Sequence, residues 1–290
     1  MQLQEGIKLF IQQNTIDLEH DRLSLYEGTI LVEKYPSYQS ISSQYYSQSF
    51  IPKLQSRLFF EDEKKLLYST DLENYKMGES LGMFKIPEQV LSCFNFLKDI
   101  ILKADITNIA LALESEESKI GILKALSYIE KLGSSINYPV LALNLPNLIT
   151  VSRQPRGNDM RYMGLHIDGW GLPYNNLENR HLSPVKIGIN LGIKERYLLF
   201  INLSLKEIRK ILIASGIGDL VSTCEPWNMG NLFMKTFPNY PVIRLKILPN
   251  EAYIAPVQNM IHDGSTLGSS SYDVNFQING YFKHIGLISS

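Results

Sequence analysis

From Tyr138 onward the chain is a series of short apolar segments separated by Gly, Pro and Asn. Segments of this length with such punctuation are typical of strands in a β-sandwich or barrel. One helix is expected among them, near 204–215, with Ser204 as its N-cap. We predict strands at about 139–152, 160–168, 185–191, 196–203, 231–237, 241–248, 251–256 and 272–282.

The first half of the chain has a different pattern. Apolar residues recur at helical spacing over 87–104, and a second helix is predicted over 115–132, where Ser115 and two glutamates form a typical helix start. Gly133 is the expected stop. Helices first and strands later predict an α+β protein. We expect a largely helical supporting region at 1–137 and a β-rich catalytic core at 138–290, integrated into one domain.

The composition excludes several classes of function. The chain has 290 residues and a formal net charge of -1, which does not suit a nucleic-acid partner. No apolar stretch approaches the ~18 residues of a membrane span, and the N-terminus does not resemble a signal peptide. We therefore expect a cytoplasmic protein with a small-molecule substrate. The two cysteines are expected to be reduced, and the sequence does not indicate an oligomeric state.

Residues 36–49, PSYQSISSQYYSQS, are rich in Ser, Gln and Tyr. This composition predicts an exposed loop. The alternative is a segment that covers the substrate, since binding residues are often carried by loops.

Two of the five histidines stand in sequences that favour metal binding. In RYMGLHIDGW, residues 161–170, strand alternation places His166 and Asp168 on one face. His262 is expected at the end of a late strand. Two imidazoles and one carboxylate form the facial triad of non-haem Fe(II) oxygenases. Zinc hydrolases can use the same ligands, but their usual HExxH helix is absent from the sequence.

These residues resemble the iron(II)/2-oxoglutarate-dependent oxygenase superfamily, whose pattern is His-x-Asp, a long gap and a distal His. HID at 166–168 and the IH that ends at His262 match it, and PNEAYIAP resembles the turn and strand that precede the distal His. The resemblance covers roughly residues 138–283. It implies a double-stranded β-helix (jelly roll) that binds Fe(II), 2-oxoglutarate and O2. It also implies hydroxylation of a C–H bond rather than halogenation, because Asp168 fills a position that the halogenases of the superfamily leave without a carboxylate.

The sequence departs from the family where 2-oxoglutarate should be anchored. The family usually places an Arg about ten residues after the distal His, and Asp273 stands near that position. Lys186 is the best candidate for a cation from another strand, and Arg161 is a second. Asn275 shares a face with Asp273 and is a further candidate contact for the cofactor. Weaker alternatives are Arg153, Arg156 and Arg244.

Three residues are candidates for contacting the substrate. Trp170 follows Asp168 in a turn-rich segment, and Asn259 lies three residues before His262. Asp273, if it points inward, would favour a cationic substrate such as a basic amino acid. His181 is a weaker candidate, and Asp263 is expected to be a turn residue.

Two other functions remain open at this point. The missing Arg motivates an iron oxidase or cyclase that does not use 2-oxoglutarate. A non-catalytic jelly-roll binding protein, in which the His and Asp residues are structural, is the alternative from a different class.

Overall fold

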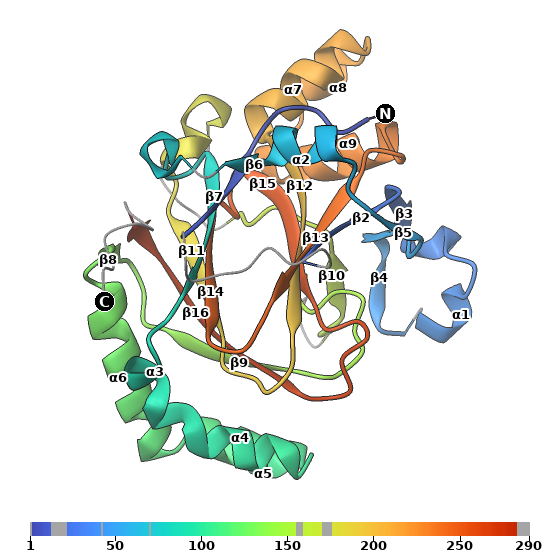
Figure 1. Cartoon of the computed structure of the whole chain (residues 1–290). Coiled ribbons are helices and arrows are strands. Elements are labelled where there is room, and N and C mark those ends of the chain that lie inside the picture. The colour runs from blue at the N-terminus through green and yellow to red at the C-terminus, as the bar shows by residue number, and fades with distance from the viewer. Residues whose placement is uncertain are drawn as a thin grey trace.

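The structure, a computed structural model, describes residues 2–12, 22–41, 43–69, 71–154, 159–169 and 176–282. It has a mixed α+β architecture that contains two large sheets and one small sheet (Figure 1). This confirms the predicted α+β class. Among the described residues, none of the helices combines the length and the apolar composition that crossing a bilayer requires.

The largest sheet has eight strands in the order β6-β1-β7-β14-β11-β16-β8, with β9 paired to β16. The pairing of β11 with β14 and with β16 is antiparallel, whereas β1 pairs with β6 and β7 in parallel. Its strands are β1 (Lys8–Ile11), β6 (Tyr68–Ser69), β7 (Ser80–Lys85), β8 (Gly133–Ser135), β9 (Val140–Asn144), β11 (Val185–Asn190), β14 (Glu251–Ala255) and β16 (Asp273–Phe282).

The second sheet has five antiparallel strands in the order β15-β12-β13-β2-β5. They are β2 (Leu23–Tyr26), β5 (Ser56–Leu58), β12 (Arg196–Ser204), β13 (Val242–Ile247) and β15 (Met260–Ser265). The small sheet contains β3 (Thr29–Leu31), β4 (Tyr45–Pro52) and β10 (Tyr162–Gly164), with β4 in the middle.

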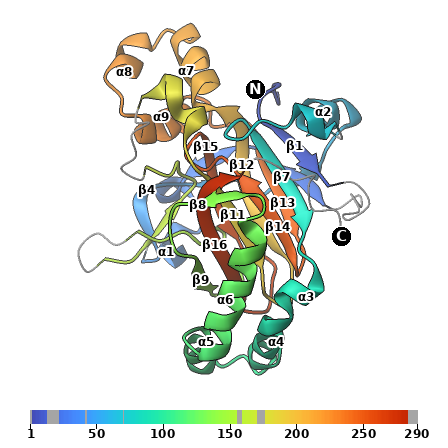
Figure 2. The same ribbon diagram turned by 90° about the vertical axis from the view of Figure 1, so that its left-hand side faces the viewer.

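Strand alternation divides the apolar residues of the eight-stranded sheet between two cores. On β11, Ile187 and Ile189 belong to a core shared with the helices that follow β7. On β14, Tyr253 and Ala255 face the other way and belong to a core shared with the five-stranded sheet. The two large sheets thus pack against each other, and one group of helices covers the outer face of the larger sheet (Figures 1 and 2).

That group of helices lies at one end of the molecule, and a second group, α7 to α9, lies at the opposite end (Figure 2). The helices near the outer face are α3 (Glu88–Leu91), α4 (Asn95–Leu102), α5 (Ile106–Leu113) and α6 (Glu116–Ile129). The others are α1 (Tyr38–Ile41), α2 (Glu61–Leu67), α7 (Leu205–Ala214), α8 (Gly218–Ser222) and α9 (Met229–Thr236). Short 3₁₀ turns cover Val32–Lys34, Leu72–Asn74, Ser92–Phe94, Leu177–Leu182 and Pro226–Asn228.

The predicted helix starts are confirmed. The Ser115 hydroxyl accepts a hydrogen bond from the backbone N–H of Ser118 at the start of α6. Ser204 accepts one from Glu207, whose carboxylate in turn accepts the Ser204 N–H, so α7 begins with a complete capping box.

The prediction of a largely helical region at 1–137 is wrong for residues 8–85. Strands β1 to β7 lie there, and β1, β2 and β7 extend the two large sheets. These segments are three to eight residues long, apart from the two-residue β6, and such short apolar runs carry no periodicity that separates strand from helix. Their partners lie far away in the sequence, as in the pairing of β2 with β13.

Two further predictions are corrected. Residues 231–237 are not a strand, because they fall largely in α9, whose buried Met229, Phe233 and Met234 recur at helical spacing. Residues 36–49 are only partly a loop, because α1 forms within them and residues 45–49 belong to β4. In β4, Tyr45 and Tyr46 are buried.

Candidate metal centre

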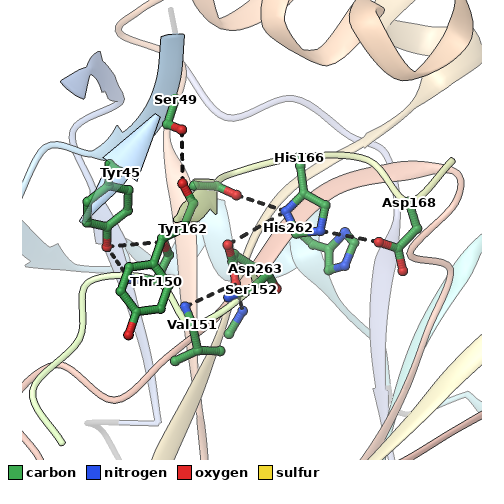
Figure 3. Close-up of polar contacts among 12 residues, drawn as sticks. Tyr45, Ser49, Thr150, Val151, Ser152, Tyr162, His166, Asp168, His262 and Asp263 are labelled. Atoms are coloured by element: carbon green, nitrogen blue, oxygen red, sulfur yellow. Dashed lines mark hydrogen bonds and ion pairs between the residues drawn. The ribbon is translucent and has the colours of Figure 1, made fainter. Parts of the chain in front are cut away.

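Three side chains meet on the inner side of the sheets: His166, Asp168 and His262 (Figure 3). Each offers one ligand atom, and these atoms all lie within 4.8 Å of one another. Among the described residues, no other group of three His, Cys, Asp or Glu side chains comes together in this way. The structure therefore unites the three residues that the sequence pattern indicated as ligands.

The backbone holds the two histidines side by side. His166 and His262 form an antiparallel bridge in which the N–H of each residue donates to the carbonyl of the other, at 3.1 and 2.8 Å. A single backbone hydrogen bond holds Asp168, whose N–H donates to the carbonyl of Val257. The extended course of 166–168 places His166 Nε2 3.2 Å from Asp168 Oδ1, on one face as alternation predicts. His262 lies within β15 rather than at the end of a strand.

Gly164 adopts a backbone conformation that directs its carbonyl toward the ring of His166. Its φ is 71°, and a Cβ there would stand 2.3 Å from the carbonyl oxygen of Phe50. Only glycine fits both conditions. In this conformation the Gly164 carbonyl accepts a hydrogen bond from His166 Nδ1 at 2.8 Å. That bond fixes the ring and leaves Nε2 as the atom that can bind a metal ion.

Asp263 lies beside the Nδ1 side of the His166 ring. The expectation that Asp263 is a turn residue is wrong. It lies in β15 and is fully buried, with Oδ2 3.6 Å from His166 Nδ1. Its other oxygen accepts hydrogen bonds from the backbone N–H groups of Val151, Ser152 and Gly264. Asp263 thus joins the loop at 150–152 to the histidine (Figure 3).

Changing Asp263 to Asn should weaken metal binding about 10- to 100-fold, the range typical of partners that orient a metal ligand. The amide keeps an oxygen for the backbone donors but removes the negative charge beside His166. Asp263→Ala, which also removes the backbone contacts, should lower the thermal midpoint much more than Asp263→Asn does. Fe(II) titration and thermal unfolding of both variants measure the two effects. Unchanged affinity in both would show that Asp263 does not orient the ligand.

Charges around the triad favour ionised Asp168 and neutral His262. Burial raises the pKa of Asp168, but Lys186 and the two histidines outweigh it and hold this pKa well below its usual range. Burial lowers the pKa of His262 to about 3. For His166, burial also acts to lower the pKa, but Asp168 and Asp263 raise it to about 10. A metal ion bound at His166 Nε2 would therefore replace a proton.

Lys186 lies beside the triad. Its Nζ donates to Asp168 Oδ2 at 2.8 Å, and the side chain is largely buried. Lys186 was the best candidate for a cation from another strand, and it lies on β11 with its ammonium group beside Asp168. Lys186 therefore pairs with Asp168 and not with Asp273, which has another partner.

Two residues of the triad, His166 and Asp168, face a cavity of about 900 Å³. His166, Asp168 and Lys186 line it, together with residues of β4, of 151–154 and of 161–169. Tyr46 to Ser49 belong to this lining, although the sequence favoured an exposed loop for them. The neighbouring tyrosines Tyr45 and Tyr46 were the one available signal, because aromatic residues are enriched in strands.

Asp273 is not positioned to bind a cationic substrate. Its carboxylate is buried and lies 3.4 Å from Arg196 Nε, and it also accepts a hydrogen bond from the Asn144 amide. The chain thus supplies the cation that neutralises this acid. Arg196 was not among the candidates, because it lies on β12 in the opposite sheet, and strand alternation says nothing about contacts between sheets.

Asn259 is turned away from the cavity. Its amide oxygen accepts from the Leu205 N–H, and its amide nitrogen donates to the Gly78 carbonyl. It therefore connects segments of the fold and does not line the cavity. Asn275 is fully buried on β16, and its amide has no hydrogen-bond partner among the described residues. It does not line the cavity.

The remaining candidates lie in different places. Arg161 lines the cavity, but Asp159 holds its guanidinium at 2.6–3.0 Å. Arg244 stacks on Tyr197 outside the cavity lining, and His181 also lies outside it. Trp170 and Arg156 lie outside the described residues.

Comparisons with family models and with curated proteins give no match. No protein-family model matches the chain, and no curated protein matches its sequence significantly. The function is therefore inferred from the residues of the site.

Proposed function

We propose that the protein is a mononuclear non-haem iron(II) oxygenase that uses 2-oxoglutarate and O2 to hydroxylate a small molecule. The observation that carries this proposal is the convergence of His166, Asp168 and His262, of which His166 and Asp168 line a large cavity. Two imidazoles and one carboxylate leave positions for a chelating co-substrate and for O2. Zinc remains a chemical alternative for the same ligands.

The donor set fits a divalent metal. His262 is neutral, Asp168 is ionised, and a backbone carbonyl fixes the ring of His166. In the absence of a metal, the Asp168 charge is compensated by Lys186 and His166. A metal ion would take over this compensation and free Lys186 for another anion.

Strand order supports a jelly roll as part of the proposal. From β9 onward the strands divide between two facing groups, β9-β16-β11-β14 in one and the segment at His166, β15, β12 and β13 in the other. The first and last strands of this series, β9 and β16, are neighbours. Two interleaved sheets with this closure are the pattern of a double Greek key. The helices and strands before β9 then extend and cover that core.

Lys186 is the residue that we assign to the remote carboxylate of 2-oxoglutarate. It is the cation nearest to Asp168, and the cavity reaches it. Once bound, iron and 2-oxoglutarate would supply the oxidising chemistry, in which O2 delivers one oxygen atom to the substrate and one to succinate, with release of CO2. The protein holds the co-substrate through Lys186, orients the ligands through Gly164 and Asp263, and shields the site within the cavity.

An anaerobic Fe(II) titration followed by turnover with 2-oxoglutarate tests this function. We expect one iron per chain, and release of succinate when O2 is admitted, even without the natural substrate, because enzymes of this chemistry turn over slowly when uncoupled. Oxygen consumption without succinate would favour the oxidase or cyclase that does not use 2-oxoglutarate. Absence of iron binding would favour a non-catalytic binding protein.

A further inference from the structure

The described residues that line the cavity carry more basic side chains than carboxylates. The Arg and Lys side chains that line the cavity are Arg153, Arg161 and Lys186, and Asp168, which also pairs with His166, is the one carboxylate among the described lining residues. Lys186 pairs with Asp168, and Arg161 pairs with Asp159. Arg153 differs from both, because within the described part of the chain no carboxylate lies within ion-pair distance of it.

Arg153 is nevertheless held in a defined position. Its guanidinium carbon lies 4.5 Å from the centre of the Tyr162 ring, and Nη2 donates to the Tyr162 hydroxyl. The backbones of the two residues also pair as an antiparallel bridge. An arginine stacked on an aromatic ring keeps the edge of its guanidinium available for a planar carboxylate. Arg153 is exposed to solvent at the cavity, so an anion can reach it.

The rest of the lining is polar but uncharged to a large extent. Six amide side chains contribute to it: Gln48, Asn144, Gln154, Asn228, Asn231 and Gln277. Amides donate and accept hydrogen bonds but cannot neutralise an anion. The one lining residue suited to that task, with no acid already beside it in the described structure, is Arg153.

We propose that Arg153 binds a carboxylate of the substrate, so that the substrate is a small organic acid such as an acylated amino acid. This inference rests on the proposed function for its oxidation step, but the binding step stands on Arg153 alone. It reverses the expectation of a cationic substrate, which depended on Asp273.

The short stretch of backbone from Tyr162 to His166 limits how far Arg153 can lie from the triad. Tyr162, the partner of Arg153, precedes His166 by four residues, which in extended backbone spans at most ~13 Å. The acid group would lie at Arg153 while a carbon several bonds away faces the metal. Oxidation would then occur away from the carboxylate.

Paired probes test this proposal. N-acetylated amino acids, each with its carboxamide of the same shape, are titrated into the protein in the presence of Mn(II) and N-oxalylglycine, and binding is followed by ligand-observed NMR. We expect acids to bind at least about 10-fold more tightly than their amides, as charge-assisted pairing with Arg implies. Arg153→Gln should abolish the preference, and Arg153→Lys should retain part of it. Arg209→Gln, which alters an exposed ion pair on α7, is the matched control.

The outcomes separate the two proposals. Equal binding of acids and amides, or no binding of any acid, would overturn the role of Arg153. So would a loss of N-oxalylglycine affinity in Arg153→Gln, because it would assign Arg153 to the co-substrate. The same titration without metal reports on Arg153 even if the iron proposal fails, since the carboxylate preference does not require the triad.

Discussion

Replacing any one of His166, Asp168 and His262 by alanine is expected to lower the affinity for Fe(II) by at least about 100-fold. Loss of a ligand should exceed the 10- to 100-fold loss typical of residues that only orient ligands. The site has three protein ligands, so removal of one leaves two, and two side chains bind a divalent ion weakly. The measurement is an anaerobic titration of Fe(II), repeated with Mn(II), whose bound form is not oxidised during the experiment.

His181→Ala is the matched control for the triad variants. It removes another imidazole among the described residues, one that does not line the cavity. We expect wild-type iron affinity and normal turnover. Because His262 and Asp168 are buried, thermal unfolding must accompany each titration, and His166→Gln and His262→Gln provide milder replacements. A folded triad variant with unchanged affinity would exclude these residues as the metal site.

Two of the three ligands, His166 and Asp168, could be predicted together because their spacing in the sequence is local. The two-residue spacing of His166 and Asp168 determines their common face in any extended segment. His262 could be predicted as the third ligand only by expecting that a late strand lies next to the segment of His166 and Asp168. The observed bridge between His166 and His262 is the contact that makes this expectation correct.

The surroundings of the triad could not be predicted, because they depend on contacts between distant segments. Asp263 is buried by the loop at 150–152, which lies more than a hundred residues earlier in the chain. Asp273 meets Arg196 across the two sheets, where no periodicity applies. The short strands of the first half likewise depend on distant partners, as in the buried ion pair between Arg22 and Glu251.

Replacing Lys186 by methionine is expected to weaken 2-oxoglutarate binding by about 30-fold or more. Truncating one member of a buried charge pair typically costs about 2–5 kcal/mol, and each 1.4 kcal/mol is about a tenfold change in affinity. Methionine keeps an unbranched apolar chain of similar length, so the cavity wall is preserved. Titration of N-oxalylglycine into the Mn(II)-loaded protein measures the effect without turnover.

Lys186→Met should have a different effect on the affinity for the metal ion. Lys186 competes with a metal ion for Asp168, because its ammonium lies 2.8 Å from Oδ2. Lys186→Met should therefore leave Fe(II) affinity unchanged or raise it, while the metal-free protein loses stability because Asp168 becomes a buried and less compensated charge. Metal should restore much of that stability by replacing the lost cation.

Opposite effects on co-substrate and metal distinguish an anchoring role for Lys186 from a structural one. General damage to the fold would lower both affinities together and would persist in the metal-bound protein. Lys119→Met, which changes an exposed ion pair on α6, should alter neither affinity. If Lys186→Met binds N-oxalylglycine as wild type does, the co-substrate is anchored elsewhere or is not 2-oxoglutarate. Succinate release by that variant would then decide between these two cases, because an enzyme that still forms succinate must hold 2-oxoglutarate through another group.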